Sequence, residues 1–171
     1  LPPNINRSKP IFTVEDNKDS LGGKAIRFGL AAIKNVGEAA ISAIMESREI
    51  GGDFKSIFDF CQRVDQQKVN KKVLESLIRV GAMDNFGKRA ALLSSLEKIR
   101  SKGVLAQKEK ANGQTGLFDA DPPTDFEEKI PDMEEFTRQE LLALEKELLG
   151  FYLTEHPLNQ YLNAIANKRS H

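Results

Sequence analysis

From Gly29 to Ser101 the apolar residues of this chain recur at intervals of three and four, which is the spacing of helices with one buried face. Turn signals that contain Gly, Asn or Asp separate the helical stretches. We therefore expect these apolar faces to pack into a mostly helical bundle of two successive helix-turn-helix pairs, in which sheet is minor.

The first pair is expected to have a short helix from Gly29, a break at KNVG and a second helix with Ile41, Ile44 and Met45 on one face. Asp53 can cap a short helix through FKSIFDFCQRV. Asn70 can cap another helix from Lys71 to Val80, before a turn at GAMDNFG and a helix across KRAALLSSLEKIRSK. The apolar faces of these last two helices hold Leu74, Leu77, Ile78, Leu92, Leu96 and Ile99.

The segment before the helical region contains two different patterns. Three prolines in the first ten residues, LPPNINRSKP, predict an extended surface segment, because proline removes amide donors and disfavours helix before it. The stretches KPIFTVED and KAIRFGL then alternate in polarity and predict a small β hairpin or an irregular edge, with a turn at Leu21–Gly23 between them.

The helical periodicity ends at Gly103, and residues 103–131 are typical of a linker rich in Gly, Asp and Pro, which we expect to be poorly ordered. A helix is expected across MEEFTRQELLALEKELLG, where Leu141, Leu144 and Leu148 form a stripe that Gly150 ends. A turn at His156-Pro157 and a last short helix follow.

Length and composition restrict the class of protein. A chain of 171 residues holds one domain with appendages, and its opening LPPNIN without Met predicts a fragment of a longer protein. The single cysteine, Cys61, lies between Phe60 and Val64 and is expected to be a buried structural thiol. Without a disulfide or a membrane-length apolar stretch, a cytoplasmic location is expected.

The net charge of zero conceals an asymmetry along the chain. Residues 1–113 carry 20 Lys and Arg against 13 Asp and Glu, whereas residues 114–171 carry 5 against 12. Residues 66–110 hold most of the basic excess, 11 against 4. The two parts are therefore expected to meet different partners, and the basic part is compatible with nucleic acid as well as with a solvated helix face.

The stretch LAAIKNVGEAA is the first candidate binding site. Two helices joined by so tight a turn place consecutive backbone N–H groups at a helix N-terminus, where a phosphate oxygen can bind. Leu30, Ile33 and Val36 would lock the turn, Gly37 would permit close approach, and Asn35 can adopt the left-handed conformation. An ordinary αα-hairpin has the same spacing, so the pattern alone leaves both interpretations open.

The stretch LAAIKNVGEAAISAI resembles the helix-hairpin-helix motif that binds duplex DNA independently of sequence, and departs from it at Lys34-Asn35, where Pro-Gly is usual. Four stretches, IRFGLAAIKNVGEAA, FKSIFDFCQRVD, KVNKKVLESLIRVGAMDNFGKRAALL and ALEKELLGFYLTEHPL, also occur in this order. Together they resemble the C-family of bacterial replicative DNA polymerases, the family of the DNA polymerase III alpha subunits. The resemblance covers nearly the whole chain.

This resemblance implies a mostly α fold: a tandem helix-hairpin-helix bundle with a minor β hairpin, then a flexible linker and C-terminal helices. The expected divisions are residues 1–28 with the β hairpin, 29–102 as the DNA-binding domain, 103–131 as the linker, and 132–171 as helices that lead toward an absent oligonucleotide-binding (OB) fold. The residues expected to contact the phosphates of a primer-template duplex are Ile33, Lys34, Asn35, Val36, Gly37, Lys71, Lys72, Arg79, Gly81, Lys88 and Arg89.

The stretch GQTGLF resembles the short motif by which bacterial replication proteins bind the sliding clamp, the beta subunit. The clamp-binding residues implied are Gln114, Thr115, Gly116, Leu117 and Phe118, with anchors at the first and last two. Taken alone, a Leu-Phe pair can equally fold back on its own core, and its position after the two helical pairs favours the clamp.

The polymerase palm and the histidine-rich domain of that family have no counterpart here, and the rest of the polymerase chain is an expected partner. We expect no catalytic residue, metal or cofactor, and binding instead of catalysis. His156 beside Glu155 is interpreted as structural, and the acids from Glu134 to Glu147 as a solvated face.

Two other functions remain open. The hairpins can serve only to pack against other proteins. Alternatively, the motif can belong to a DNA glycosylase or nuclease, in which a catalytic Asp follows the hairpin helix, but the first Asp here is Asp53, a capping candidate.

Overall fold

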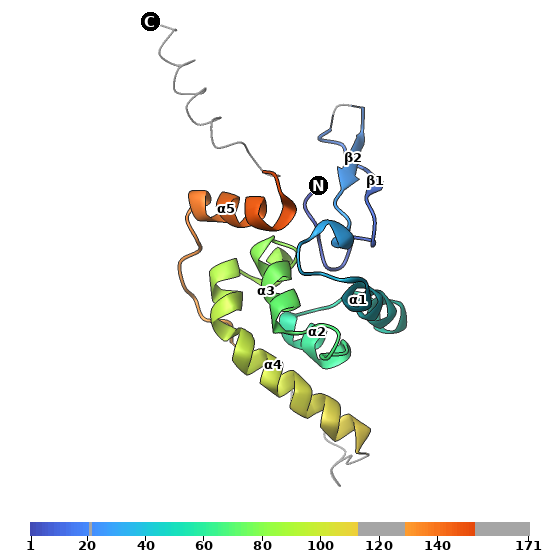
Figure 1. The fold of residues 1–171 in the computed structure, drawn as a ribbon, viewed down its shortest axis with the longest axis vertical. Coiled ribbons are helices and arrows are strands. Elements are labelled where there is room, and N and C mark those ends of the chain that lie inside the picture. The colour runs from blue at the N-terminus through green and yellow to red at the C-terminus, as the bar shows by residue number, and fades with distance from the viewer. Residues whose placement is uncertain (21, 113–128, 153–171) are drawn as a thin grey trace, which may run out of the picture.

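The structure is a computed structural model that describes residues 1–20, 22–112 and 129–152. In this part of the chain the fold is mostly helical with one small two-stranded sheet, as the sequence predicted (Figure 1). The elements are β1 (Thr13–Asp16), β2 (Lys24–Arg27), the 3₁₀ turn η1 (Leu30–Ala32), α1 (Glu38–Gly51), α2 (Ile57–Arg63), α3 (Lys71–Arg79), the 3₁₀ turn η2 (Asp84–Phe86), α4 (Arg89–Ala111) and α5 (Arg138–Leu149).

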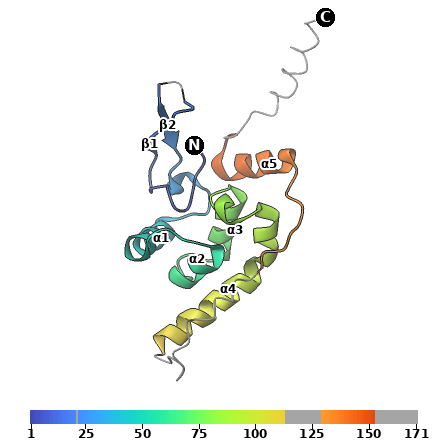
Figure 2. The same cartoon turned by 180° about the vertical axis from the view of Figure 1, so that it is seen from behind.

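The helices form a bundle with the hairpin at one end. Figures 1 and 2 show α2, α3 and the first part of α4 together at the centre, with α5 beside α3 and the far end of α4 projecting away. One apolar core runs through η1, α1, α2, α3 and α4 and reaches Leu148 and Leu149 of α5. The predicted faces of α3 and α4 are confirmed, because all six of their named residues are buried.

The β hairpin is also confirmed. Its strands are antiparallel, with Thr13 opposite Arg27 and Val14 opposite Ile26. The expectation for residues 1–10 is wrong, however, because they pack into the fold. Ile5 is fully buried, and its N–H donates to the carbonyl of Ala82 at 2.8 Å. Proline withholds its own amide, but the amides and the apolar side chain between the prolines remain free to pack.

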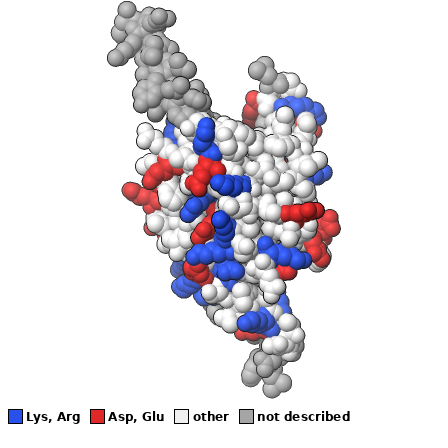
Figure 3. Space-filling view, viewed as in Figure 1, with Lys and Arg blue, Asp and Glu red and all other residues white. Residues whose placement is uncertain are grey.

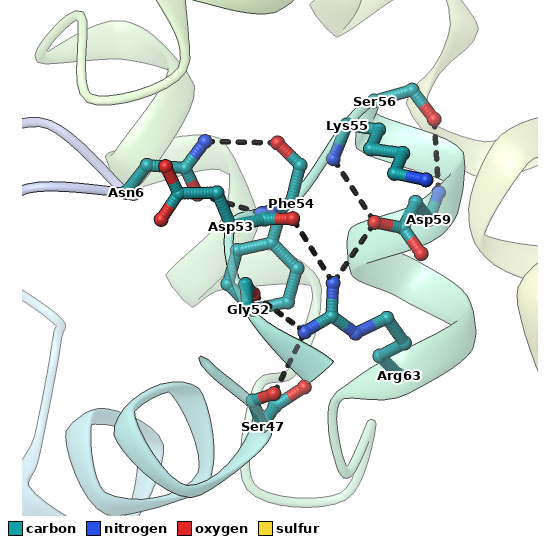
Figure 4. Close-up of polar contacts among 9 residues, drawn as sticks. All are labelled: Asn6, Ser47, Gly52, Asp53, Phe54, Lys55, Ser56, Asp59 and Arg63. Atoms are coloured by element: carbon teal, nitrogen blue, oxygen red, sulfur yellow. Dashed lines mark hydrogen bonds and ion pairs between the residues drawn. The ribbon is translucent and has the colours of Figure 1, made fainter. Parts of the chain in front are cut away.

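The connection from α1 to α2 is held by one arginine (Figure 4). Arg63 of α2 donates to the carbonyl oxygens of Ser47 at 2.7 Å, Gly52 at 2.7 Å and Asp53 at 3.3 Å. Its guanidinium also forms an ion pair with Asp59 at 3.0 Å. Because these carbonyls belong to the last turns of α1 and the residues that follow, Arg63 joins α2 to the end of α1.

The two predicted caps differ in outcome. Asn70 caps α3 as predicted, since its side chain accepts from the Val73 N–H at 3.1 Å. Asp53 does not cap α2; Ser56 does, accepting from the Asp59 N–H at 3.0 Å. An Asp53 cap would start the helix at Phe54, whereas α2 starts at Ile57. Phe54 lies before the helix because its N–H and C=O pair with the side-chain amide of Asn6.

Helix α4 is longer than its periodicity predicts. The expected linker begins at Gly103, but α4 continues through this residue to Ala111, so that boundary is wrong. Gly103 packs directly on α2, where a Cβ would lie 2.8 Å from the Cβ of Cys61. Gln107 then donates to the carbonyls of Cys61, Gln62 and Val64, at 2.6 to 3.2 Å. Tertiary contact with α2 therefore sustains helix where the sequence lacks an apolar stripe.

Helix α5 begins at Arg138, later than the stretch from Met133 suggested, behind a Thr137–Glu140 capping box. Gly150, with φ of 83°, ends it as predicted. Two of the three leucines of the predicted stripe are wrong. Leu148 is buried as predicted, but Leu141 and Leu144 are only half-buried. The other buried leucines of the helix are Leu142 and Leu149. The buried face of α5 differs from the predicted face because the helix packs against α3 with Glu145 buried.

Candidate nucleic-acid interface

The turn between η1 and α1 has the locked geometry that the sequence predicted. Leu30, Ile33 and Val36 are almost fully buried, at 0%, 2% and 6% exposure. They hold the turn against the core while the residues between them stay at the surface. The first helix of this pair is shorter than expected, however, because it is only the three-residue 3₁₀ turn η1.

Asn35 is the residue of this turn that adopts a positive φ. Its φ is +70°, in the left-handed region that Asn tolerates better than other residues with a side chain. Its side-chain Nδ2 donates to the hydroxyl of Ser76 on α3 at 3.0 Å. This contact joins the turn of the first helical pair to the second pair.

The N-terminus of α1 is open. Gly37 is its N-cap residue and has no side chain with which to cap the first turn. A Cβ added at Gly37 would have no neighbouring atom within 4 Å. Lys34, three residues before Gly37, is exposed, and its backbone N–H donates to the carbonyl of Leu148 at 2.9 Å. The positive end of the α1 dipole is therefore at the surface, three residues after the exposed Lys34.

The second turn is closed. Gly81 has φ of +86° and is buried, and a Cβ there would lie 2.2 Å from the guanidinium of Arg89. Arg89 is 8% exposed and donates through both Nε and Nη2 to the Asp84 carboxylate, at 2.9 and 2.8 Å. A third donation goes to the carbonyl of Arg79 at 3.1 Å. Gly81 and Arg89, expected at the interface, are instead parts of the packed interior, because a buried guanidinium needs these acceptors.

The remaining cations of the second pair differ in their availability. Lys71 pairs with Glu97 and, at 4.0 Å, with Glu75, and the Glu97 hydrogen bond raises the pKa of Lys71. Lys88 pairs with Asp132 at 3.2 Å. Lys72 is exposed on α3. Figure 3 shows the same mixture, with Lys and Arg gathered across the middle of one face and Asp and Glu among them.

Glu135 is the contact that sequence reasoning missed. Its carboxylate accepts from the backbone N–H groups of Arg89 at 2.7 Å and Ala90 at 3.0 Å, at the start of α4. These residues lie 46 and 45 positions away along the chain. The only local signal is an acid among other acids, so nothing in the sequence could have marked it.

Cys61 is buried as predicted, and burial raises the pKa of its thiol to about 12. Among residues 1–20, 22–112 and 129–152, no cluster of His, Cys, Asp and Glu could hold a metal ion. The same residues include no helix of a length and hydropathy suited to crossing a membrane. Gln114, Thr115, Gly116, Leu117 and Phe118 lie outside the described residues, as does His156.

Comparison with known proteins gives two results. The model of the helix-hairpin-helix motif family matches residues 1–92, just over half of the chain. The DNA polymerase III alpha subunits of Vibrio cholerae, Thermus aquaticus and Escherichia coli K12 are 41%, 44% and 42% identical to this chain over 99%, 94% and 96% of its length. The chain spans only 14%, 12% and 14% of the length of these three relatives.

Proposed function

This chain belongs to the helix-hairpin-helix motif family, and from that membership we propose that it binds the phosphate backbone of duplex DNA without sequence specificity, through the turn Ile33–Gly37. The observation that carries the proposal is the open N-terminus of α1 behind a turn whose apolar residues are buried. Backbone N–H groups there can donate to a phosphate oxygen, and Gly37 leaves room for it.

The contact is smaller than the sequence suggested. Lys34 and Lys72 are exposed cations of the expected interface, whereas Lys71 and Lys88 have carboxylate partners and Arg89 is buried. If about two phosphates are neutralised, log affinity falls with log salt at a slope of roughly −1.8. Because phosphates carry no base identity, duplexes of different sequence should bind equally.

Three charge variants test this interface by fluorescence anisotropy with a labelled duplex. Lys34→Glu should weaken binding for all duplex sequences, and Glu38→Gln should strengthen it, because Glu38 is an exposed acid in the first turn of α1. Lys18→Glu makes the same charge change on the exposed β1–β2 connection and should have little effect. Equal losses for the two lysine variants would show that only net charge matters and would refute the proposed turn.

The relatives suggest the setting of this binding. They are DNA polymerase III alpha subunits, and the chain corresponds to one segment of such a protein. We propose that this segment is a non-catalytic part of a bacterial, cytoplasmic replicative DNA polymerase and holds the primer-template duplex while the remainder of the polypeptide performs nucleotidyl transfer. A duplex grip that ignores sequence suits an enzyme that must move along any template.

We further propose that Gln114–Phe118 binds the sliding clamp, with Leu117 and Phe118 as apolar anchors. Each anchor contributes about 1.5 to 3 kcal/mol when buried, so the isolated motif should bind weakly. Attachment to DNA-bound hairpins raises the effective concentration and makes weak binding sufficient. Clamp binding is measured for the chain and for a Leu117→Ala, Phe118→Ala double variant with unchanged helical content. Equal binding by both would assign the pair to the chain's own packing.

A further inference from the structure

The last turn of α5 is bonded to the turn that leads into α1. The carbonyl oxygen of Leu148 accepts from the backbone N–H of Lys34 at 2.9 Å. Leu148 belongs to the last turn of α5, where backbone carbonyls have no amide of the same helix to accept from. Lys34 therefore supplies a donor for the end of α5, and Leu148 in return fixes the backbone of Lys34.

Two further contacts hold the residues near Lys34. Asn35 donates to Ser76 of α3 at 3.0 Å, and α3 packs against α5. On the other side of η1, the ring centroid of Phe28 lies 5.1 Å from that of Phe151, the second residue after α5. Figures 1 and 2 show the end of α5 beside η1. The segment that contains η1 and the turn is therefore held at both ends by α5 or by a helix that packs on α5.

Gly150 directs the chain from α5 to Phe151. It adopts the left-handed conformation, with φ of 83°, and its N–H donates to the carbonyl of Lys146 at 2.9 Å. Gly150 is exposed, and a Cβ added there would meet no packed atom within 4 Å. A side chain at this position would therefore strain the backbone at the end of α5 without disturbing a packed neighbour.

We propose that residues 148–151, at the end of α5, position the turn at residues 33–37 for DNA, so that Leu148 and Gly150 are positioning residues of the interface. The inference rests on the proposed binding of duplex DNA by this turn. A turn that is already held in one shape loses less conformational entropy when it binds a phosphate. The helix-hairpin-helix family model matches residues 1–92, so α5 lies outside the motif that it supports.

The test compares two glycines that end helices with a positive φ. Gly150→Ala strains the end of α5. The matched control is Gly52→Ala, because Gly52 is the C-cap of α1 with φ of 70°, is exposed, and also has no packed atom within 4 Å of an added Cβ. Hydrogen exchange at the Lys34 amide, followed in the ¹⁵N-labelled chain without DNA, reports on the bond to Leu148. Fluorescence anisotropy with a labelled duplex measures the affinity for DNA.

Gly150→Ala should speed exchange at the Lys34 amide and weaken duplex binding by roughly 3- to 10-fold, the range that one hydrogen bond contributes. Gly150→Asn should recover most of both, because Asn tolerates the left-handed conformation. Gly52→Ala should leave both unchanged, although it lowers the free energy of unfolding. Equal losses of affinity in the two alanine variants, or faster Lys34 exchange in Gly150→Ala with unchanged affinity, would overturn the proposal.

Phe151→Ala covers the case in which Gly150→Ala does not fold, because Phe151 is 44% exposed and outside the core. It removes the ring contact with Phe28 and should also weaken duplex binding, whereas Leu105→Ala, at an exposed leucine of α4, should not. Equal affinities of these two variants would count against the positioning role. Exchange at Lys34 is followed without DNA, so unchanged exchange in Gly150→Ala refutes positioning by α5, whereas a lack of duplex binding by the unaltered chain refutes the proposed function.

Discussion

Asn35 allows the strain in the first turn to be measured separately from its hydrogen bond. Replacement by Ala keeps a side chain at φ of +70° and removes the bond to Ser76. The left-handed conformation costs Ala about 1 to 2 kcal/mol. The lost hydrogen bond costs about 0.5 to 1.5 kcal/mol. Its loss takes the Asn35 amide away from the Ser76 hydroxyl, and Ser76 is only 3% exposed. We expect Asn35→Ala to lower the free energy of unfolding by about 2 to 3 kcal/mol in total.

Ser76→Ala is the matched control, because it removes the same hydrogen bond without altering the turn. It should cost only the bond, about 1 kcal/mol. In the Ser76→Ala background, Asn35→Ala should cost only the backbone strain, so the two substitutions should be less than additive by about 1 kcal/mol. Asn35→Gly relieves the strain and should be less destabilising than Asn35→Ala.

Urea unfolding followed by circular dichroism measures all four variants, and duplex binding is measured on those that fold. Asn35→Gly should retain DNA affinity, since the turn keeps its shape, whereas Asn35→Ala should weaken it. The reasoning would be refuted if Asn35→Ala and Ser76→Ala were equally stable, because residue 35 would then impose no strain on the turn.

Three further predictions concern two buried residues, Gly103 and Cys61, and the Glu135 carboxylate. Gly103→Ala should lower the free energy of unfolding, measured in urea, by about 1 kcal/mol. The added Cβ would meet Cys61 at 2.8 Å, and such overpacking costs about 1 to 3 kcal/mol, whereas the gain in helix propensity is about 1 kcal/mol. The control Ser101→Ala, at an exposed position of the same helix, should not destabilise the chain. The Cys61 thiol, whose pKa burial raises to about 12, should react with thiol reagents at neutral pH only at the rate of unfolding, and faster reaction would contradict its burial. Burial opposes ionisation of Glu135, but hydrogen bonds from the backbone N–H groups of Ala90, Phe136 and Arg89 lower its pKa. Its contribution to stability is therefore present above the unfolded pKa, near the ordinary value of 4.5, and is lost as the pH falls through the folded pKa. The stability difference between the unaltered chain and Glu135→Gln should accordingly shrink in acid.

The contrast between the two helical pairs matters for how the DNA-binding surface is understood. The sequence shows 11 basic residues between Gln66 and Lys110, which suggested that the second pair contributes most of the charge to a duplex. In the structure several of those cations have carboxylate partners. Three of these carboxylates, Asp132, Glu135 and Glu145, belong to the acidic part of the chain, residues 114–171. The basic and acidic parts thus partly neutralise each other.

The sequence by itself determined the features that depend on residues close together. The helical faces of α3 and α4 follow from apolar side chains three and four positions apart. The Asn70 cap and the αL conformation of Asn35 follow from bonds and sterics within one turn of chain. Each of these could be predicted because the residues involved lie within a few positions of one another in the sequence.

Only the tertiary structure decided which cations remain available and where α4 ends. Gln107 meets the carbonyls of α2 across 43 to 46 positions, and Glu135 meets the start of α4 across 45 and 46. Such contacts depend on how α5 and the segment before it pack against the bundle, which no local pattern encodes. An exposed and a buried arginine look the same in a sequence, because their difference lies in partners that the fold brings from far along the chain.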